Sequence, residues 1–295
     1  MLISKKRFAC RCIKKESLKM DIRYSVSKNE FKSMDTAALR KNFLIDDLFQ
    51  DDKIKLCYSH YDRIIAGGAV PNAKELVLEA SDELAAKYFL ERREMGIINI
   101  AGDGSVVADG ISYPMKKYDC LYLGRGTKEI KFISDSAEKP AVFYFNSTPA
   151  HKEYPTVHIP KEKAVQAALG SSTDCNERII YKYILPGNVE SCQLVMGLTI
   201  LAEGSVWNTM PTHTHERRME VYLYFDVPKN HTVFHMMGPG DETRHITVRD
   251  RQAVISPSWS IHSGVGTKNY SFIWGMCGEN QDFDDMQGIA TDDLL

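Results

Sequence analysis

From about residue 53 onward, short apolar segments with alternating polar positions are separated by Gly, Asp, Asn and Pro. These segments are rich in Val, Ile, Tyr and Phe, which favours strands over helices. Asp109-Gly110 lies between two such segments and is a strong signal for a tight hairpin turn. The pattern predicts an all-β fold of the sandwich or barrel type with only a few short helices.

The expected elements divide into two series. In the first we expect strands at 54–58, 61–65, 96–100, 105–108, 111–114 and 141–146, with a break at Gly67-Gly68. In the second we expect strands at 193–201, 207–215, 221–225, 232–237, 244–248, 253–256 and 270–274. Short helices are expected at 34–40, with Asp35 or Thr36 as N-cap, at 81–87 and at 161–168.

The two series of predicted strands contain a similar short motif. Glu91-Arg92-Arg93-Glu94 resembles Glu216-Arg217-Arg218-Met219-Glu220, and each lies just before a predicted strand. Such a repeat indicates a duplicated barrel. We therefore expect a basic, disordered extension at 1–19, a lead-in at 20–50, an N-terminal barrel at 51–150, a linker at 151–177 and a C-terminal barrel at 178–295.

Composition narrows the class of protein. The formal net charge is −2, so we expect no bulk attraction to nucleic acid or to an anionic membrane. The seven cysteines are odd in number and widely spaced, and the close pair Cys10 and Cys12 has no nearby metal ligands. No apolar segment follows the basic start as in a signal peptide, and reduced thiols fit the cytoplasm.

The candidate chemistry lies in the second series. His213 and His215 are two residues apart, so on a strand they project from one face, and Glu220 follows after a possible bend. His262 follows a predicted strand and precedes a glycine, which fits a barrel lip. Three neutral imidazoles and one carboxylate suit zinc, manganese, iron or nickel. The other histidines are expected to be structural or at the surface: His60, His151, His158, His231, His235 and His245.

The ligand spacing resembles the cupin pattern, although Gly204 and Val227 do not match its glycine positions. From about Met20 onward the chain also closely resembles the 5-keto-4-deoxyuronate isomerase family, most clearly over 58–65, 89–100, 212–224 and 253–280. The resemblance implies a bicupin fold, zinc bound by His213, His215, Glu220 and His262, and a homohexamer. It further implies an aldose–ketose isomerase that converts 5-dehydro-4-deoxy-D-glucuronate to 3-deoxy-D-glycero-2,5-hexodiulosonate in the breakdown of pectin-derived uronates.

The first barrel is expected to hold no metal. Glu94 lies near the matching glutamate position, but no His-x-His precedes it. We expect this half to serve packing and subunit contact.

Ketol isomerisation also needs groups that bind the substrate and move a proton. Alternation from Glu220 points Tyr222, Tyr224 and Arg218 into the barrel. Arg218 is a candidate for the substrate carboxylate, and Tyr222 or Tyr224 for a proton relay. Glu216, His245 and Lys268 are further candidates. Transfer through an enediolate and a hydride shift both remain open.

Two other functions use the same residues. A cupin oxidoreductase, such as an iron or manganese dioxygenase, would lose activity without oxygen. A non-catalytic sugar-acid binding protein would have affinity for its ligand without turnover.

Overall fold

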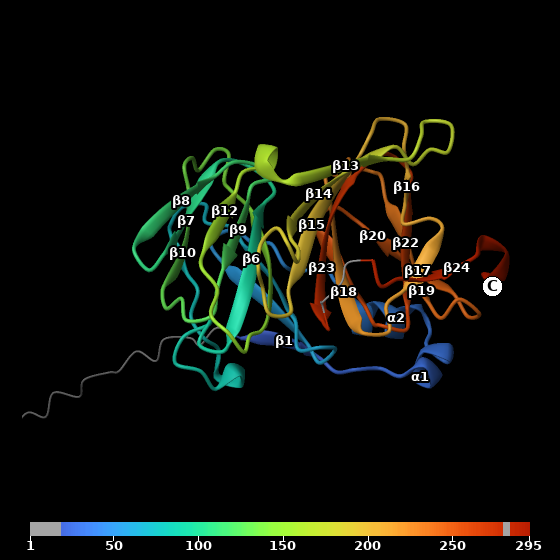
Figure 1. Ribbon diagram of the computed structural model, residues 1–295, viewed down its shortest axis with the longest axis horizontal. Helices are drawn as coiled ribbons and strands as arrows, with labels where there is room; N and C mark the ends of the chain where they lie inside the picture. The colour runs from blue at the N-terminus through green and yellow to red at the C-terminus, as the bar shows by residue number, and fades with distance from the viewer. Residues whose placement is uncertain (1–18, 280–283) are drawn as a thin grey trace, which may run out of the picture.

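The structure is a computed structural model that describes residues 19–279 and 284–295. The predicted basic extension, except Lys19, and the Cys10/Cys12 pair lie outside the described residues. The described chain forms two halves, and each half consists of a seven-stranded and a four-stranded sheet (Figure 1). The predicted all-β architecture of two tandem cupin-type barrels is confirmed.

The strand order is the same in the two halves, which supports the predicted duplication. In the first half the large sheet has the order β1 (Met20–Arg23), β3 (Ile54–Ser59), β4 (Ile65–Ala69), β11 (Phe143–Pro149), β6 (Arg93–Asn99), β9 (Cys120–Leu123) and β12 (Val157–Ile159). The small sheet has the order β5 (Leu76–Val77), β10 (Ile130–Ser134), β7 (Gly104–Ala108) and β8 (Ile111–Met115).

The second half repeats this arrangement. Its large sheet has the order β13 (Val165–Leu169), β14 (Arg178–Ile184), β15 (Val195–Leu201), β23 (Ser271–Gly278), β18 (Arg218–Phe225), β21 (Gln252–Ser256) and β2 (Leu44–Ile45). Its small sheet has the order β16 (Trp207–Asn208), β22 (Ile261–Gly266), β19 (Val233–Gly238) and β20 (Arg244–Val248). A further pair joins β17 (Thr212–Thr214) to β24 (Gln287–Ile289). Strand β18 therefore occupies the place that β6 has in the first half.

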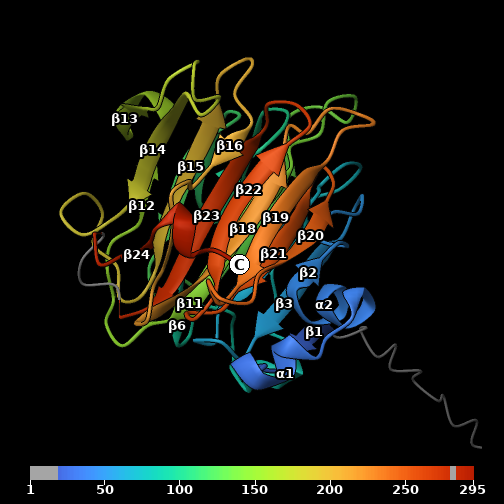
Figure 2. The same cartoon turned by 90° about the vertical axis from the view of Figure 1, so that its right-hand side faces the viewer.

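Helices are few and short: α1 (Lys28–Lys32), α2 (Thr36–Phe43) and the 3₁₀ turns η1 (Asp82–Leu84), η2 (Lys161–Lys163) and η3 (Thr291–Asp293). The predicted N-cap of α2 is confirmed, because the Asp35 carboxylate accepts a hydrogen bond from the Ala38 amide at 2.7 Å. Although they come early in the chain, α1 and α2 lie against the second half (Figures 1 and 2). The lead-in thus supplies β1 to the first large sheet and β2 to the second.

The apolar side chains form three cores. One fills each barrel, and the third lies between the two large sheets, which pack back to back. Strict alternation along β18 produces two of them: Tyr222 and Tyr224 face the second barrel, whereas Val221 and Leu223 face the first half. The sheets approach closely at Gly96, where a Cβ atom would lie 2.6 Å from Ile184.

The predicted strand at 61–65 and the predicted break at Gly67-Gly68 are both wrong. Residues 61–64 form a turn in which Asp62 and Arg63 have positive φ, and the expected break at Gly67-Gly68 lies inside β4. A Cβ on Gly67 would meet the Phe145 ring at 2.2 Å, so this strand needs glycine because its neighbours are close. At the Asp109-Gly110 hairpin the prediction is confirmed, since both residues have positive φ between β7 and β8.

Other corrections concern segments whose structure depends on distant pairing. The predicted helix at 161–168 is only the η2 turn followed by β13, which pairs with β14, and the predicted helix at 81–87 is only η1. The predicted linker 151–177 carries β12 and β13, which are edge strands of the two large sheets. Several strands were not predicted at all, among them β9, β10 and β22.

Candidate metal centre and its cavity

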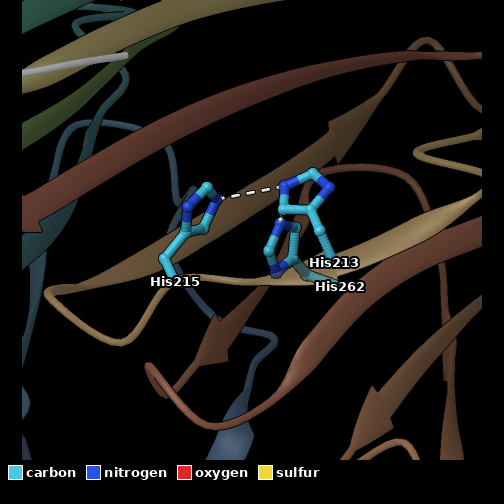
Figure 3. A group of neighbouring side chains, drawn as sticks. All are labelled: His213, His215 and His262. Carbon is cyan, nitrogen blue, oxygen red and sulfur yellow. Dashed lines mark hydrogen bonds between the residues drawn. The ribbon is translucent and has the colours of Figure 1, made fainter. Parts of the chain in front are cut away.

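Four of the predicted site residues lie together at one end of the second barrel. The Nε2 atoms of His213 and His215 are 3.1 Å apart, and those of His213 and His262 are 3.0 Å apart (Figure 3). The Oε2 atom of Glu220 lies 3.2 Å from Nε2 of His262 and 3.6 Å from Nε2 of His215. The three imidazole nitrogens thus gather at one point, and the Glu220 carboxylate lies beside two of them.

Three separate segments bring these donors together. The predicted strand at 207–215 is in fact β16 and β17, separated by a turn in which Thr209 has positive φ and Met210–Pro211 is a cis peptide. His213 lies in β17 and His215 just after it, before the chain enters β18, which carries Glu220. His262 follows the predicted strand, which is β21, after a turn, and it lies near the start of β22. Its partner across the sheet is Met237.

The donor set fits a divalent cation. Oxygen Oε2 of Glu220 is buried and has no hydrogen-bond partner among the described residues, a costly arrangement for a carboxylate. The Nε2 atom of His213 lies at hydrogen-bond distance from those of His215 and His262, yet a neutral imidazole nitrogen carries either a proton or a lone pair. Ligand atoms of a single tetrahedral zinc ion lie about 3.3 Å apart, which is close to the spacing observed here. A cation bound by the three nitrogens would also give the Glu220 carboxylate a partner.

Burial keeps the imidazoles of His213 and His262 neutral. It lowers the pKa of His213 to about 3, with smaller contributions from His215 and Arg218. The pKa of His262 is lowered well below its usual value, again mainly by burial. These histidines therefore present lone pairs at neutral pH, which is the state that binds metal ions.

A cavity of about 470 Å³ opens beside the four donors. Tyr222 forms part of its wall, as predicted from the alternation, and its hydroxyl lies 3.1 Å from Oγ1 of Thr209. Burial raises the pKa of Tyr222 well above its usual value, so the hydroxyl stays protonated at neutral pH. Tyr222 can therefore donate a hydrogen bond into the cavity.

Arg218 also lines the cavity, but it is already engaged. Its fully buried guanidinium pairs with Asp285 at 2.7 Å, and Asp285 also pairs with Arg217. Asp285 lies just before β24, which pairs with the strand that carries His213. Arg218 therefore ties the C-terminal segment to the site, which makes it a poor candidate for the substrate carboxylate.

The remaining sequence candidates lie elsewhere. The hydroxyl of Tyr224 bonds Nδ1 of His235 at 2.8 Å inside the barrel, and Tyr224 does not line the cavity. Glu216, His245 and Lys268 are exposed and are also not part of its wall. His235 is fully buried, as expected of a structural histidine.

Two cations and one indole are among the cavity-wall residues that sequence reasoning missed. Arg178 and Lys182 project from β14, and Trp274 projects from β23. Gly197 makes room for Trp274, because a Cβ there would lie 2.1 Å from the indole ring. The signal that could have found the two cations is their spacing of four residues, which puts both on one face if the segment forms a strand.

In the first barrel the position of the ligand glutamate is held by methionine. Arg93-Glu94-Met95 begins β6, whereas Arg218-Met219-Glu220 begins β18, so the acid and the methionine are exchanged. Met95 faces the interior of the first barrel, and Glu94 faces the core between the sheets. The observation supports the prediction that the first barrel holds no metal.

The fold and the donor set together define a class: a two-barrel cupin protein with a candidate mononuclear metal centre in its second barrel. Within that class the chain belongs to the KduI/IolB family, whose model matches residues 43–290. The resemblance noted in the sequence is thereby confirmed.

Named relatives match nearly the whole chain. A 4-deoxy-L-threo-5-hexosulose-uronate ketol-isomerase of Lachnoclostridium phytofermentans is 61% identical over 275 residues, which cover 93% of this chain and 100% of the relative. One of the same name from Pectobacterium carotovorum subsp. carotovorum is 53% identical over 277 residues, with the same coverage.

Solved structures support the fold. An IolB-like protein from Salmonella typhimurium aligns with a TM-score of 0.67 at 14% identity, covering 84% of this chain and 97% of its own. An oxalate decarboxylase from Lactobacillus farciminis aligns with a TM-score of 0.54 at 10% identity, covering 79% of this chain and 80% of its own. At these identities the likeness concerns the fold alone.

Proposed function

We propose that this chain is a ketol-isomerase that converts 4-deoxy-L-threo-5-hexosulose uronate, also called 5-dehydro-4-deoxy-D-glucuronate, to 3-deoxy-D-glycero-2,5-hexodiulosonate. The observation that carries the proposal is the cluster of three imidazoles with one buried carboxylate beside a cavity. Relatives with 51–61% identity bear the corresponding enzyme name.

The cavity residues suit the chemistry of this isomerisation. A divalent cation held by His213, His215, Glu220 and His262, for which we propose zinc, supplies a Lewis acid for the carbonyl and hydroxyl oxygens of the substrate. The protonated hydroxyl of Tyr222 is placed to donate a hydrogen bond to one of these oxygens. Thr209 orients that hydroxyl, and the apolar faces of Phe272 and Trp274 limit the entry of water.

The proposal predicts activity that depends on the cation. Purified protein should carry one zinc per chain by elemental analysis and should isomerise the keto-uronate with and without oxygen. Chelation should lower the rate by at least about 100-fold, because the Lewis acid contributes several kcal/mol to the transition state. Adding zinc back should restore it. Full turnover by metal-free protein would contradict the mechanism, and a requirement for oxygen would favour an oxidoreductase.

We propose further that the chain forms a homo-oligomer, for which the family resemblance suggests a hexamer. The edge strand β13 supports self-association, because Val165 and Leu169 are 51% and 46% exposed on it. Sedimentation equilibrium should give a single species several times heavier than one chain. A monomer at micromolar concentration would contradict this.

We also propose a cytoplasmic location. The described cysteines, Cys57, Cys120, Cys175, Cys192 and Cys277, are all free thiols, which supports a reducing compartment. No helix in the described part of the chain is long and apolar enough to span a membrane.

A further inference from the structure

Cationic side chains gather in the cavity wall away from the metal ligands. Arg178 and Lys182 lie on the same face of β14, with Ile180 between them, and all three line the cavity. The Arg178 guanidinium donates a hydrogen bond to the backbone carbonyl of Asn176 at 2.8 Å. No ion pair of Arg178 occurs within 19–279 and 284–295. A guanidinium with no acidic partner at a cavity wall is suited to an anionic ligand.

Strand register places Lys182 opposite the candidate metal centre, and Arg178 lies four residues along the same strand face. Lys182, Gly197, Trp274 and Tyr222 are successive cross-strand partners on β14, β15, β23 and β18. Neighbouring strands lie about 4.8 Å apart, so the backbones at Lys182 and Tyr222 are roughly 14 Å apart. Gly197 has no side chain, and the Trp274 indole lies over it between the two ends of this row.

This spacing suits an extended six-carbon acid. The terminal carbons of such an acid are about 6 Å apart when the chain is extended with bonds near 1.5 Å. The long side chains of Lys182 and Arg178 reach across the rest of the distance from β14. A substrate with its carbonyl end beside Glu220 would direct its far end along Trp274 toward β14. The cavity therefore has one end for the reacting carbons and another for a negative charge.

We infer that Arg178 and Lys182 form the subsite that binds the carboxylate of the substrate and selects uronates over neutral sugars. This inference rests on the proposed isomerase function and assigns the carboxylate to β14, where sequence reasoning assigned it to Arg218. Arg218 is already paired with Asp285. Arg178, which has no ion pair within the described residues, is therefore the cavity-wall guanidinium suited to an acidic ligand, and Lys182 lies on the same face of β14. Asp284 also lines the cavity, but it is exposed to solvent, which screens its charge.

The test compares the keto-uronate with its methyl ester, which has the same carbon chain and no charge. Wild type should prefer the acid by about 10- to 100-fold in kcat/KM, as expected for charge-assisted hydrogen bonds. Arg178→Met and Lys182→Met should each raise KM for the acid about 10-fold or more with little change in kcat. The ester should be affected little. Arg178→Lys should recover part of the preference, since it retains the charge.

Two measurements separate this inference from the proposed function. Elemental analysis should give unchanged metal content in both variants, and Lys229→Met, which removes an exposed lysine outside the cavity, should behave as wild type. Calorimetric binding of acid and ester to metal-loaded protein reads the preference even if no turnover occurs. Absence of turnover with a retained preference would overturn the isomerase function alone. An unchanged acid-to-ester ratio in Arg178→Met and Lys182→Met would overturn the subsite.

Discussion

Glu220→Gln should lose both bound metal and activity, with a fall in rate of at least about 1,000-fold at ambient zinc. Glutamine keeps the shape of the side chain but removes the negative charge that faces the imidazoles of His215 and His262. Three neutral nitrogens alone hold a divalent cation more weakly, and we expect the affinity for zinc to fall more than about 100-fold. Elemental analysis and a ketol-isomerisation assay on the same preparation measure the two losses.

Glu216→Gln is the matched control for this variant. It makes the same chemical change four residues upstream, at an exposed side chain that does not line the cavity. Its metal content and rate should equal those of wild type. Excess zinc should restore part of the activity of Glu220→Gln but leave Glu216→Gln unchanged. A Glu220→Gln protein with full zinc and a normal rate would refute the assignment of Glu220 as a ligand.

Glu94→Gln should destabilise the fold without changing the chemistry. The buried carboxylate of Glu94 accepts hydrogen bonds from the amides of Cys192, Gln193 and Leu194 in the other half of the chain, at 2.7 to 3.1 Å. It also accepts from Tyr122 and Thr148. An amide group would turn one acceptor into a donor that faces other donors, at a cost of about 2–4 kcal/mol.

Thermal unfolding should show this as a fall in the midpoint of roughly 5–15 °C. The exposed Glu138→Gln in the same half is the control and should leave the midpoint unchanged. Metal content of the folded Glu94→Gln protein should stay at one per chain, since Glu94 faces away from the barrel interior. A loss of bound metal together with an unchanged unfolding midpoint would mean that Glu94 is a ligand and not a structural contact.

The sequence predicts this fold well where local signals decide it. Turn residues such as Asp109-Gly110 and the N-cap Asp35 act within a few residues, and both are confirmed. The predictions are wrong where a distant partner decides, as at β13, which pairs with β14, and at Gly67, which lies against Phe145. A short window along the chain does not contain these partners.

The same limit applies to the site. The spacing of His213, His215 and Glu220 is local, so the sequence points to them directly, whereas the role of Arg218 depends on Asp285, 67 residues further on. The face on which Glu94 lies can be read only from the strand register. Arg93-Glu94 resembles the ligand segment in sequence, but a shift of one residue along a strand moves the acid to the opposite face.

The core between the two large sheets limits how far this protein can be reduced in size. All four proposed ligands and the cavity lie in the second half, but the rear of their supporting sheet presents Val221, Leu223 and Ile273 to the first half. A deletion variant without residues 51–150 would expose that apolar surface to water, and we expect it to aggregate. The first half thus covers the apolar rear face of the second large sheet. A catalyst reduced to the second half would need polar residues at those positions.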